Sequence, residues 1–221
     1  MTPYYSDDAV TIYHGDAREV LPGLAADVIL TDPPYAVGLG YDEYDDSPRA
    51  LAALVADVHP LMLAAAPVVA LTPGVANIHA WPRPRWTLCW RSTNAAGSTG
   101  YWGFNEWQPV MVYGTDPYLS LGMGRRPDVV SVASSFDSEW HALKNEGHPC
   151  PKPLGAWKMI LVRVCPVEGA TVLDPFMGSG TTLRAAKDLG RKAIGIELSE
   201  RYCEIAAKRM AQEVLDFGGV T

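Results

Sequence analysis

The chain has 221 residues and a net charge of −7, with 48% hydrophobic and 19% charged residues, which is typical of one globular domain with a substantial core. No apolar stretch reaches the length of a bilayer span, the first residues lack the pattern of a secretory signal, and the four scattered cysteines form no C-x-x-C pair. These features argue against a membrane span, a zinc site and a disulfide framework, and they favour a cytoplasmic protein.

The first half of the chain alternates predicted strands and helices. Predicted strands are 10–13, 27–30 and 68–71, and predicted helices are 17–21 and 49–66. Residues 36–48 are rich in Gly, Tyr and acids without a period, which predicts a mobile loop.

The segment TDPPY, residues 31–35, directly follows one of these predicted strands. Two adjacent prolines fix the backbone between an acid and an aromatic ring. On its own such a segment is typical of a turn, so the rest of the chain has to decide whether it does more.

The middle of the chain is aromatic and mildly basic within an acidic protein. Residues 80–165 hold nine Lys or Arg and six Asp or Glu, whereas residues 1–60 hold two Lys or Arg and eleven Asp or Glu. Strands are predicted at 87–91 and 109–113, and residues 114–147 form a predicted irregular insertion. A phosphate backbone would be met in this region if the protein binds nucleic acid.

The C-terminal third continues the alternation. It predicts helices at 153–164, 181–189 and 199–215 and strands at 171–173 and 193–196. Strands that alternate with helices indicate an α/β protein with a largely parallel sheet.

The sequence TVLDPFMGSGTTLRAA places a strand ending in Asp174, a turn with two glycines and a helix start in succession. At the carboxyl end of a parallel strand, this arrangement binds ligands. A P-loop would need Lys after Gly180, and a dinucleotide loop would need Gly where Leu183 stands. A single nucleoside without a pyrophosphate fits best, with Glu197 placed for two ribose hydroxyls, and S-adenosylmethionine is such a cofactor. The alternative for both acids is a capping or turn role.

Three motifs in order, DPPY (32–35), GHPCPKP (147–153) and DPFMGSGTT (174–182), resemble the amino-DNA methyltransferases, which methylate adenine at N6 or cytosine at N4. The catalytic tetrapeptide precedes the cofactor loop, as in the β group of that family. The resemblance implies a Rossmann-like α/β fold of S-adenosylmethionine-dependent methyltransferases, with a mostly parallel doubly wound sheet, one antiparallel strand and circularly permuted motif order. We expect one domain over residues 1–221, with a small target-recognition insertion around 114–147.

The resemblance also implies the site residues. The expected catalytic residues are Asp32, Pro33, Pro34 and Tyr35. The expected cofactor-binding residues are Asp16, His148, Lys152, Asp174, Phe176, Met177, Gly178, Ser179, Gly180, Thr181, Thr182 and Glu197. Lys152 resembles the lysine beside the cofactor carboxylate, although Pro151 stands where the family usually has Gln. The basic and aromatic middle region supplies the expected DNA contacts, namely Arg83, Arg85, Arg91, Tyr101, Trp102, Phe104, Arg125 and Arg126.

The chemistry of a nucleobase amino group explains the form of DPPY. The nitrogen is a poor nucleophile because its lone pair is delocalised into the ring. The Asp32 carboxylate and the Pro33 carbonyl can accept its two N–H groups and free the lone pair for direct attack on a sulfonium methyl, without a cysteine nucleophile. Tyr35 would stack on a base rotated out of the duplex.

We therefore expect a methyltransferase that acts on double-stranded DNA. Adenine N6 is the preferred target, because DPPY is commoner in adenine enzymes, and cytosine N4 is the alternative. A methyltransferase of RNA or protein amides usually has the opposite motif order, and a DNA- or nucleotide-binding module without activity would not need the acids, glycines and lysine together. A homodimer would enlarge the DNA surface, and we expect no metal and no membrane contact.

Overall fold

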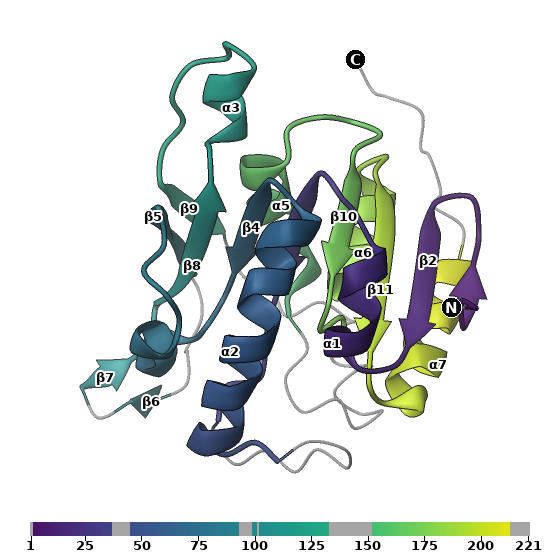
Figure 1. Ribbon diagram of the computed structural model, residues 1–221. Helices are drawn as coiled ribbons and strands as arrows, with labels where there is room; N and C mark the ends of the chain where they lie inside the picture. The colour runs from purple at the N-terminus through teal and green to yellow at the C-terminus, as the bar shows by residue number, and fades with distance from the viewer. Residues whose placement is uncertain (1, 37–44, 93–98, 101, 133–151, 213–221) are drawn as a thin grey trace.

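The computed structural model describes residues 2–36, 45–92, 99–100, 102–132 and 152–212. Within these ranges one sheet of nine strands forms the centre of the molecule (Figure 1). From one edge to the other, its strands are β1 (Tyr5–Ser6), β2 (Val10–His14), β11 (Lys192–Glu197), β10 (Thr171–Asp174), β3 (Val28–Thr31), β4 (Val68–Leu71), β8 (Trp107–Gly114), β5 (Trp86–Ser92) and β9 (Val129–Val132). A separate hairpin joins β6 (Thr99–Gly100) to β7 (Gly103–Phe104).

The strand order confirms the predicted doubly wound fold. β2, β11, β10, β3 and β4 are parallel, and β8 runs antiparallel between β4 and β5 as the expected antiparallel strand. The short β1 adds a second antiparallel pairing at the edge, beside β2. The sheet places β3 next to β10, so the two segments that end in Asp-Pro become neighbours although they are far apart in sequence.

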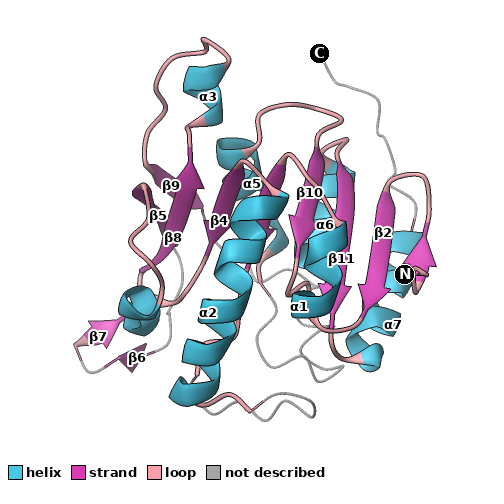
Figure 2. Cartoon of the chain, in the orientation of Figure 1, coloured by secondary structure: helices cyan, strands magenta, loops and turns pink. Residues whose placement is uncertain are grey.

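Helices cover both faces of the sheet (Figure 2). α1 (Ala17–Val20) and α2 (Pro48–Ala65) lie on one face, and α5 (Leu154–Val164), α6 (Thr181–Asp188) and α7 (Glu200–Ala211) lie on the other (Figure 1). Side chains alternate along each strand, so in β3 Ile29 packs in the cluster with α2 while Val28 and Leu30 pack with α5 and α6. Because β3 is buried on both faces, its sequence is an unbroken apolar run, which is the run seen before TDPPY.

Helix α2 shows how the sequence sets these elements. Ser47 is its N-cap and accepts a hydrogen bond from the Ala50 N–H at 3.2 Å, and Pro48 occupies the first turn. Leu51, Val55 and Val58 recur at helical spacing and are buried against the sheet. By length and composition alone α2 could cross a membrane, but this buried apolar stripe is that of a core helix.

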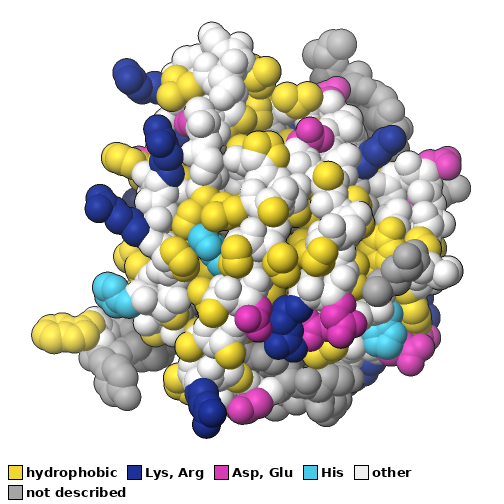
Figure 3. Space-filling model, viewed as in Figure 1, with side chains coloured by type: hydrophobic (Ala, Val, Ile, Leu, Met, Phe, Trp, Pro, Cys, Tyr) yellow, Lys and Arg dark blue, Asp and Glu magenta, His cyan; other side chains and the backbone are white. Residues whose placement is uncertain are grey.

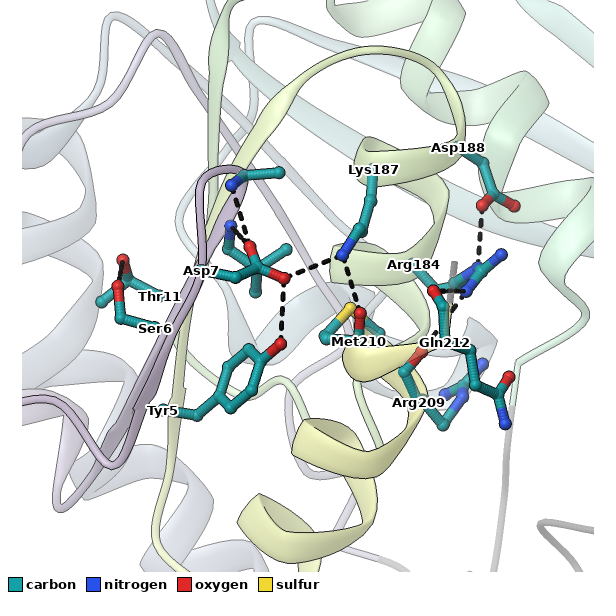
Figure 4. Close-up of polar contacts among 12 residues, drawn as sticks. Tyr5, Ser6, Asp7, Thr11, Arg184, Lys187, Asp188, Arg209, Met210 and Gln212 are labelled. Atoms are coloured by element: carbon teal, nitrogen blue, oxygen red, sulfur yellow. Dashed lines mark hydrogen bonds and ion pairs between the residues drawn. The ribbon is translucent and has the colours of Figure 1, made fainter. Parts of the chain in front are cut away.

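Polar contacts tie the N-terminal hairpin to the C-terminal helices (Figure 4). The Asp7 carboxylate accepts hydrogen bonds from the N–H groups of Ala9 and Val10, and the Lys187 ammonium lies 2.8 Å from it. Lys187 also donates to the Met210 carbonyl at 2.7 Å and so joins α6 to the end of α7. Burial alone would raise the pKa of Asp7, but the Lys187 contact and the two N–H donors lower it to about 2. The hairpin is therefore held by a charged group at neutral pH.

The predicted irregular insertion, 114–147, is only partly irregular. Its described part contains the short helix α3 (Pro117–Ser120) and the strand β9, which pairs in parallel with β5 in the main sheet. We did not predict this strand, because its short apolar run VVSV follows a segment rich in glycine and arginine. Residues 133–147 and most of the predicted loop 36–48 lie outside the described residues. The two 3₁₀ turns, η1 (Leu21–Gly23) and η2 (Val75–Ala80), were not predicted.

Candidate active site

The carboxyl ends of the parallel strands open into one cavity of about 410 Å³. Asp32 follows β3, Asp174 ends β10 and Glu197 ends β11, and all three side chains line this cavity. The volume suits a ligand of nucleoside size, and the position is the one where doubly wound sheets bind ligands. The structure thus brings together the three acids that the sequence predicted for catalysis and cofactor binding.

The two oxygens of the Asp32 carboxylate have different partners. Oδ1 accepts hydrogen bonds from the hydroxyls of Tyr35 and Thr72, and Oδ2 faces the Lys152 ammonium. Thr72 follows β4 and is buried, and its N–H donates to the Thr31 carbonyl at 3.1 Å. The carboxylate is therefore fixed by groups from β4 and by the segment that precedes α5.

The turn after Asp32 is held at several points. Ala36 has a φ of 53°, unusual for a residue other than glycine, and its N–H donates to the buried Asp46 carboxylate at 2.7 Å. The Asn77 amide of η2 donates to the Tyr35 carbonyl. Burial and then the charge of Asp32 raise the pKa of the Tyr35 phenol, which keeps it protonated as a hydrogen-bond donor. Tyr35 thus helps to orient Asp32, a role that we did not predict beside its expected stacking.

Asp174 is enclosed much more tightly than Asp32. It is buried and accepts hydrogen bonds from the Thr31 hydroxyl at 2.6 Å, the Phe176 N–H at 3.0 Å and the Thr182 hydroxyl. Burial raises the pKa of Asp174 to about 6 in spite of these donors. The residue just before Asp32 therefore supports the acid of the neighbouring strand.

The glycine turn lies between Asp174 and Glu197. Gly178 and Gly180 have φ values of 51° and 82°, in the left-handed region that favours glycine. The Glu197 carboxylate accepts hydrogen bonds from the N–H groups of Gly178 and Ser199, both at 2.9 Å. Burial raises the pKa of Glu197 to about 7. Glu197 therefore shapes the loop in addition to lining the cavity.

Several other predicted cofactor residues also hold the loop in place. Met177 is buried in the core, and a side chain at Gly195 would come within 2.3 Å of its sulfur. Thr182 accepts a hydrogen bond from the buried Trp157 indole at 2.7 Å. Arg209 of α7 donates to the Ser179 carbonyl. These contacts fix the start of α6, and the cavity is also lined by Met177, Ser179, Thr181 and Thr182.

Asp16 lies at the end of the cavity away from Asp32, on the strand β2 side. It is the N-cap of α1, accepting the Arg18 N–H at 2.8 Å, and it forms an ion pair with the Arg18 guanidinium at 2.5 Å. This pairing lowers the pKa of Asp16, with burial opposing it. Asp16 thus lines the cavity and has a capping role that the sequence did not indicate, and its cofactor contact stays a prediction.

The residues that line the cavity fit a cationic nucleoside cofactor. Five acidic side chains and two basic ones line it, and this excess of acids favours a positively charged ligand. The acids are Asp16, Asp32, Asp45, Asp174 and Glu197, and the basic residues are Arg18 and Lys152. Phe176, Leu198 and Tyr202 supply apolar or aromatic lining for a base and ribose. No group of three or more His, Cys, Asp or Glu that could hold a metal ion occurs within the described ranges.

The predicted DNA contacts are split between two edges of the sheet. Strand register places Arg91 near Trp107, on the same side as the end of β4 that precedes Thr72. Arg85, Arg125 and Arg126 lie at the opposite edge of the sheet, and their contact with DNA stays a prediction. There they line a second cavity of about 570 Å³ together with Val68, the first residue of β4. Arg85 directly precedes β5 and Arg91 lies near its end, so the length of this strand separates the two arginines. Figure 3 shows Lys and Arg side chains along the side that carries α3, β5 and β9.

The structure describes some of the other predicted DNA-binding and cofactor-binding residues and not others. Arg83 is exposed between η2 and β5, and Trp102 is fully exposed in the β6–β7 hairpin. His148, Tyr101 and the Phe104 side chain lie outside what the structure describes. Sequence reasoning missed Thr31, Thr72, Asn77 and Trp157. The only signal for Thr31 and Thr72 was a polar residue at the end of each apolar strand.

Comparison with known protein families agrees with this geometry. The DNA methylase family of N6 and N4 enzymes matches residues 76–208, which is more than half of the chain. The chain belongs to this family. The predicted resemblance to amino-DNA methyltransferases is therefore confirmed.

Individual relatives match most of the chain, and two solved structures share its fold. A putative methylase YubD of Escherichia coli is 30% identical, with 89% of this chain and 88% of that protein covered. The type II methyltransferase M.ScaI of Streptomyces caespitosus is 26% identical, with 96% and 84% covered. The crystal structure of an M1.HpyAVI complex with S-adenosylmethionine has a TM-score of 0.67 at 24% identity, covering 92% of this chain and all of that one. The cytosine-N4-specific PvuII DNA methyltransferase has a TM-score of 0.69 at 17% identity, covering 96% and 89%, and confirms the fold.

Proposed function

We propose that this protein transfers a methyl group from S-adenosylmethionine to the N6 amino group of adenine in double-stranded DNA. The observation that carries the proposal is the single cavity shared by Asp32 and the Asp174–Glu197 loop. A donor bound at the loop and an amino group bound at Asp32 would lie side by side, which is the proximity that a direct transfer needs.

Asp32 and Pro33 act on the amino group. The Asp32 carboxylate and the Pro33 carbonyl accept its two N–H groups, so the nitrogen lone pair is released from the ring. The nitrogen then loses a proton as it gains the methyl group, and Asp32 is the nearest base to receive that proton. Because the hydroxyls of Tyr35 and Thr72 fix Asp32 in advance, little reorganisation is needed when the base arrives.

The methyl donor would be held by the opposite half of the cavity. Glu197 is placed for the ribose hydroxyls, the Gly178–Gly180 turn for close backbone approach, and Lys152 for the carboxylate. S-adenosylmethionine supplies the electrophilic methyl when bound. None of the three cysteines that the structure describes lines the cavity, in keeping with direct transfer without a covalent enzyme intermediate.

The choice of adenine rests on the tetrapeptide DPPY, since both target bases present the same kind of amino group. Purified protein is incubated with DNA that lacks methylated bases and with methyl-labelled S-adenosylmethionine, and the digested nucleosides are identified by mass spectrometry. We expect labelled N6-methyladenine. Label found only in N4-methylcytosine would replace adenine by cytosine, and no label in any nucleoside would overturn the proposed activity.

We further propose that DNA binds across the carboxyl edge, where Arg91 and the exposed Trp102 lie. Arg91 near the end of β5 and Arg85 before its start form a matched pair of exposed arginines. Arg91→Ala should weaken DNA binding about threefold or more at moderate salt, whereas Arg85→Ala should leave it nearly unchanged. The affinity for DNA is measured by fluorescence anisotropy. An equal loss of affinity in both variants would mean that the DNA binds elsewhere on the protein. The target-recognition insertion around 114–147 and a homodimer stay predictions; light scattering tests the dimer.

A further inference from the structure

Lys152 occupies two places that the target base needs. Its ammonium faces Oδ2 of Asp32, the oxygen not engaged by the hydroxyls of Tyr35 and Thr72. The same ammonium lies over the Tyr35 ring, 4.9 Å from the ring centroid. A base that stacked on that ring face and donated its amino hydrogen to Oδ2 would meet Lys152 at both points.

The other partners of Asp32 cannot give way as easily as Lys152. Thr72 is buried, with 1% of its surface exposed, and its backbone is tied to Thr31. Tyr35 is held by the Asn77 contact to its carbonyl, and its ring packs beside Gly74, where an added Cβ would lie 3.5 Å from the ring. Lys152 instead reaches Asp32 with a long flexible side chain. Oδ2 is therefore the oxygen that can be exchanged between a cation of the protein and a substrate.

A bound cofactor would bring a further carboxylate into the cavity that Lys152 lines. In S-adenosylmethionine a short methylene chain joins the sulfonium to the carboxylate, so a methyl group placed beside Asp32 brings the carboxylate into the same part of the cavity. Of the described residues that line the cavity, only Lys152 and Arg18 are Lys or Arg, and Arg18 is paired with Asp16. Lys152 is thus the cation within reach of that carboxylate.

We propose that Lys152 is a positioning residue that exchanges between the two carboxylates. Without cofactor it pairs with Asp32 and holds the place of the target amino group, and with cofactor it moves to the cofactor carboxylate and leaves Oδ2 open. Cofactor binding and base entry are then coupled through one ammonium, and such coupling is reciprocal. This inference rests on the proposed function in one respect, the role of Asp32 as the amino-group acceptor.

Calorimetry with two ligands tests the exchange without DNA. S-adenosylhomocysteine carries the carboxylate, and 5′-methylthioadenosine lacks the amino-acid part. If Asp32 competes for Lys152, Asp32→Asn should tighten S-adenosylhomocysteine binding about fivefold and leave methylthioadenosine binding unchanged. Unchanged affinity for S-adenosylhomocysteine, or an equal gain for both ligands, would overturn the exchange.

A double-mutant cycle separates exchange from a general effect of charge. In Lys152→Met, S-adenosylhomocysteine should bind more weakly, and adding Asp32→Asn should then have no effect. If Asp32→Asn still tightens binding in that background, Lys152 is not the shared partner. Lys158→Met is the matched control, because Lys158 pairs with Asp188 at 2.5 Å and does not line the cavity. It should leave the affinity unchanged, and Lys152→Gln replaces Lys152→Met if the latter fails to fold.

The outcome is distinguishable from a failure of the proposed function. The cycle measures ligand binding alone, so it can succeed when no methylated nucleoside is formed, and it can fail when methylation is seen. Labelled nucleoside together with an unchanged Asp32→Asn affinity would refute the lysine exchange and leave the methyltransferase activity intact.

Discussion

Two aspartates lie at the ends of neighbouring strands, each before a proline, and their surroundings differ. Asp174 ends β10, is buried, and accepts hydrogen bonds from Thr31, Phe176 and Thr182. Asp32 follows β3, is partly open to the cavity, and keeps one oxygen paired with a flexible lysine. The same dipeptide at the same edge of a sheet thus gives one carboxylate enclosed by donors and one that can be offered to a substrate.

The enclosed carboxylate and the carboxylate available to a substrate thus belong to different strands. A carboxylate with buried donors on several sides shapes the glycine turn and has little freedom to bind anything else. A carboxylate fixed on one oxygen and exchangeable on the other is prepared for a substrate group. Each carboxylate accepts a hydrogen bond from the hydroxyl of a threonine near a strand end. Thr31 donates to Asp174, and Thr72 donates to Asp32.

The largest change in stability should follow loss of the enclosed acid. Asp174→Ala leaves the donors of Thr31, Phe176 and Thr182 without their acceptor, which should lower the free energy of unfolding by roughly 2–4 kcal/mol. Urea denaturation followed by circular dichroism measures the change. Asp32→Ala, whose donors can be met by water in the cavity, should cost about 1 kcal/mol or less. Equal losses of unfolding free energy in the two variants would show that the two aspartates are enclosed to the same degree.

The second expected effect is a dependence of stability on pH through Glu197. Burial raises the pKa of this acid from 4.5 to about 7, so the folded state holds its proton more tightly than the unfolded state. The resulting stability is complete below pH 4.5 and is lost as pH rises through about 7. Between pH 5.5 and 8 we expect Glu197 to lower the free energy of unfolding of the cofactor-free protein by about 2 kcal/mol, and Asp174, whose pKa is raised to about 6, adds to this fall. Glu197→Gln should flatten this slope, and a slope that is unchanged in the variant would assign it to other groups.

The smallest effects should come from the two threonines, and they should differ in kind. Thr31→Val removes a donor to a buried acid and should lower the free energy of unfolding by about 1 kcal/mol. Thr72→Val should leave Asp32 less well oriented, lowering kcat about tenfold with little change in cofactor affinity. Denaturation and single-turnover transfer, measured on both variants, test the contrast. If Thr72→Val lowers only the free energy of unfolding and leaves kcat unchanged, Thr72 has no positioning role.

Local patterns predicted most of the fold and one half of the site. Apolar runs placed β3, β4, β10 and β11 to within a residue or two, because strands buried on both faces have a clear signature. The motifs placed Asp32, Asp174 and Glu197 at the strand ends, and the sheet order then brought these acids to one cavity.

The missing half consists of contacts between distant segments. Nothing in the sequence pairs Thr72 or Lys152 with Asp32, since those contacts depend on the order of strands and on side-chain directions. The arginines show the same limit, because Arg85 and Arg91 are close in sequence but strand β5 carries them to different edges. The strand β9 was missed because four residues of a pattern cannot outweigh the turn residues before them.

The variant Asp32→Asn can separate activation of the amino group by Asp32 from binding of the donor in the other half of the cavity. Methyl transfer into unmethylated DNA is measured under single-turnover conditions, with S-adenosylhomocysteine binding measured on the same preparation. We predict that transfer falls by at least about 10³-fold while cofactor binding is retained or becomes tighter. Transfer within about tenfold of the unaltered protein would contradict the account, because a lost acceptor of this importance costs more than that.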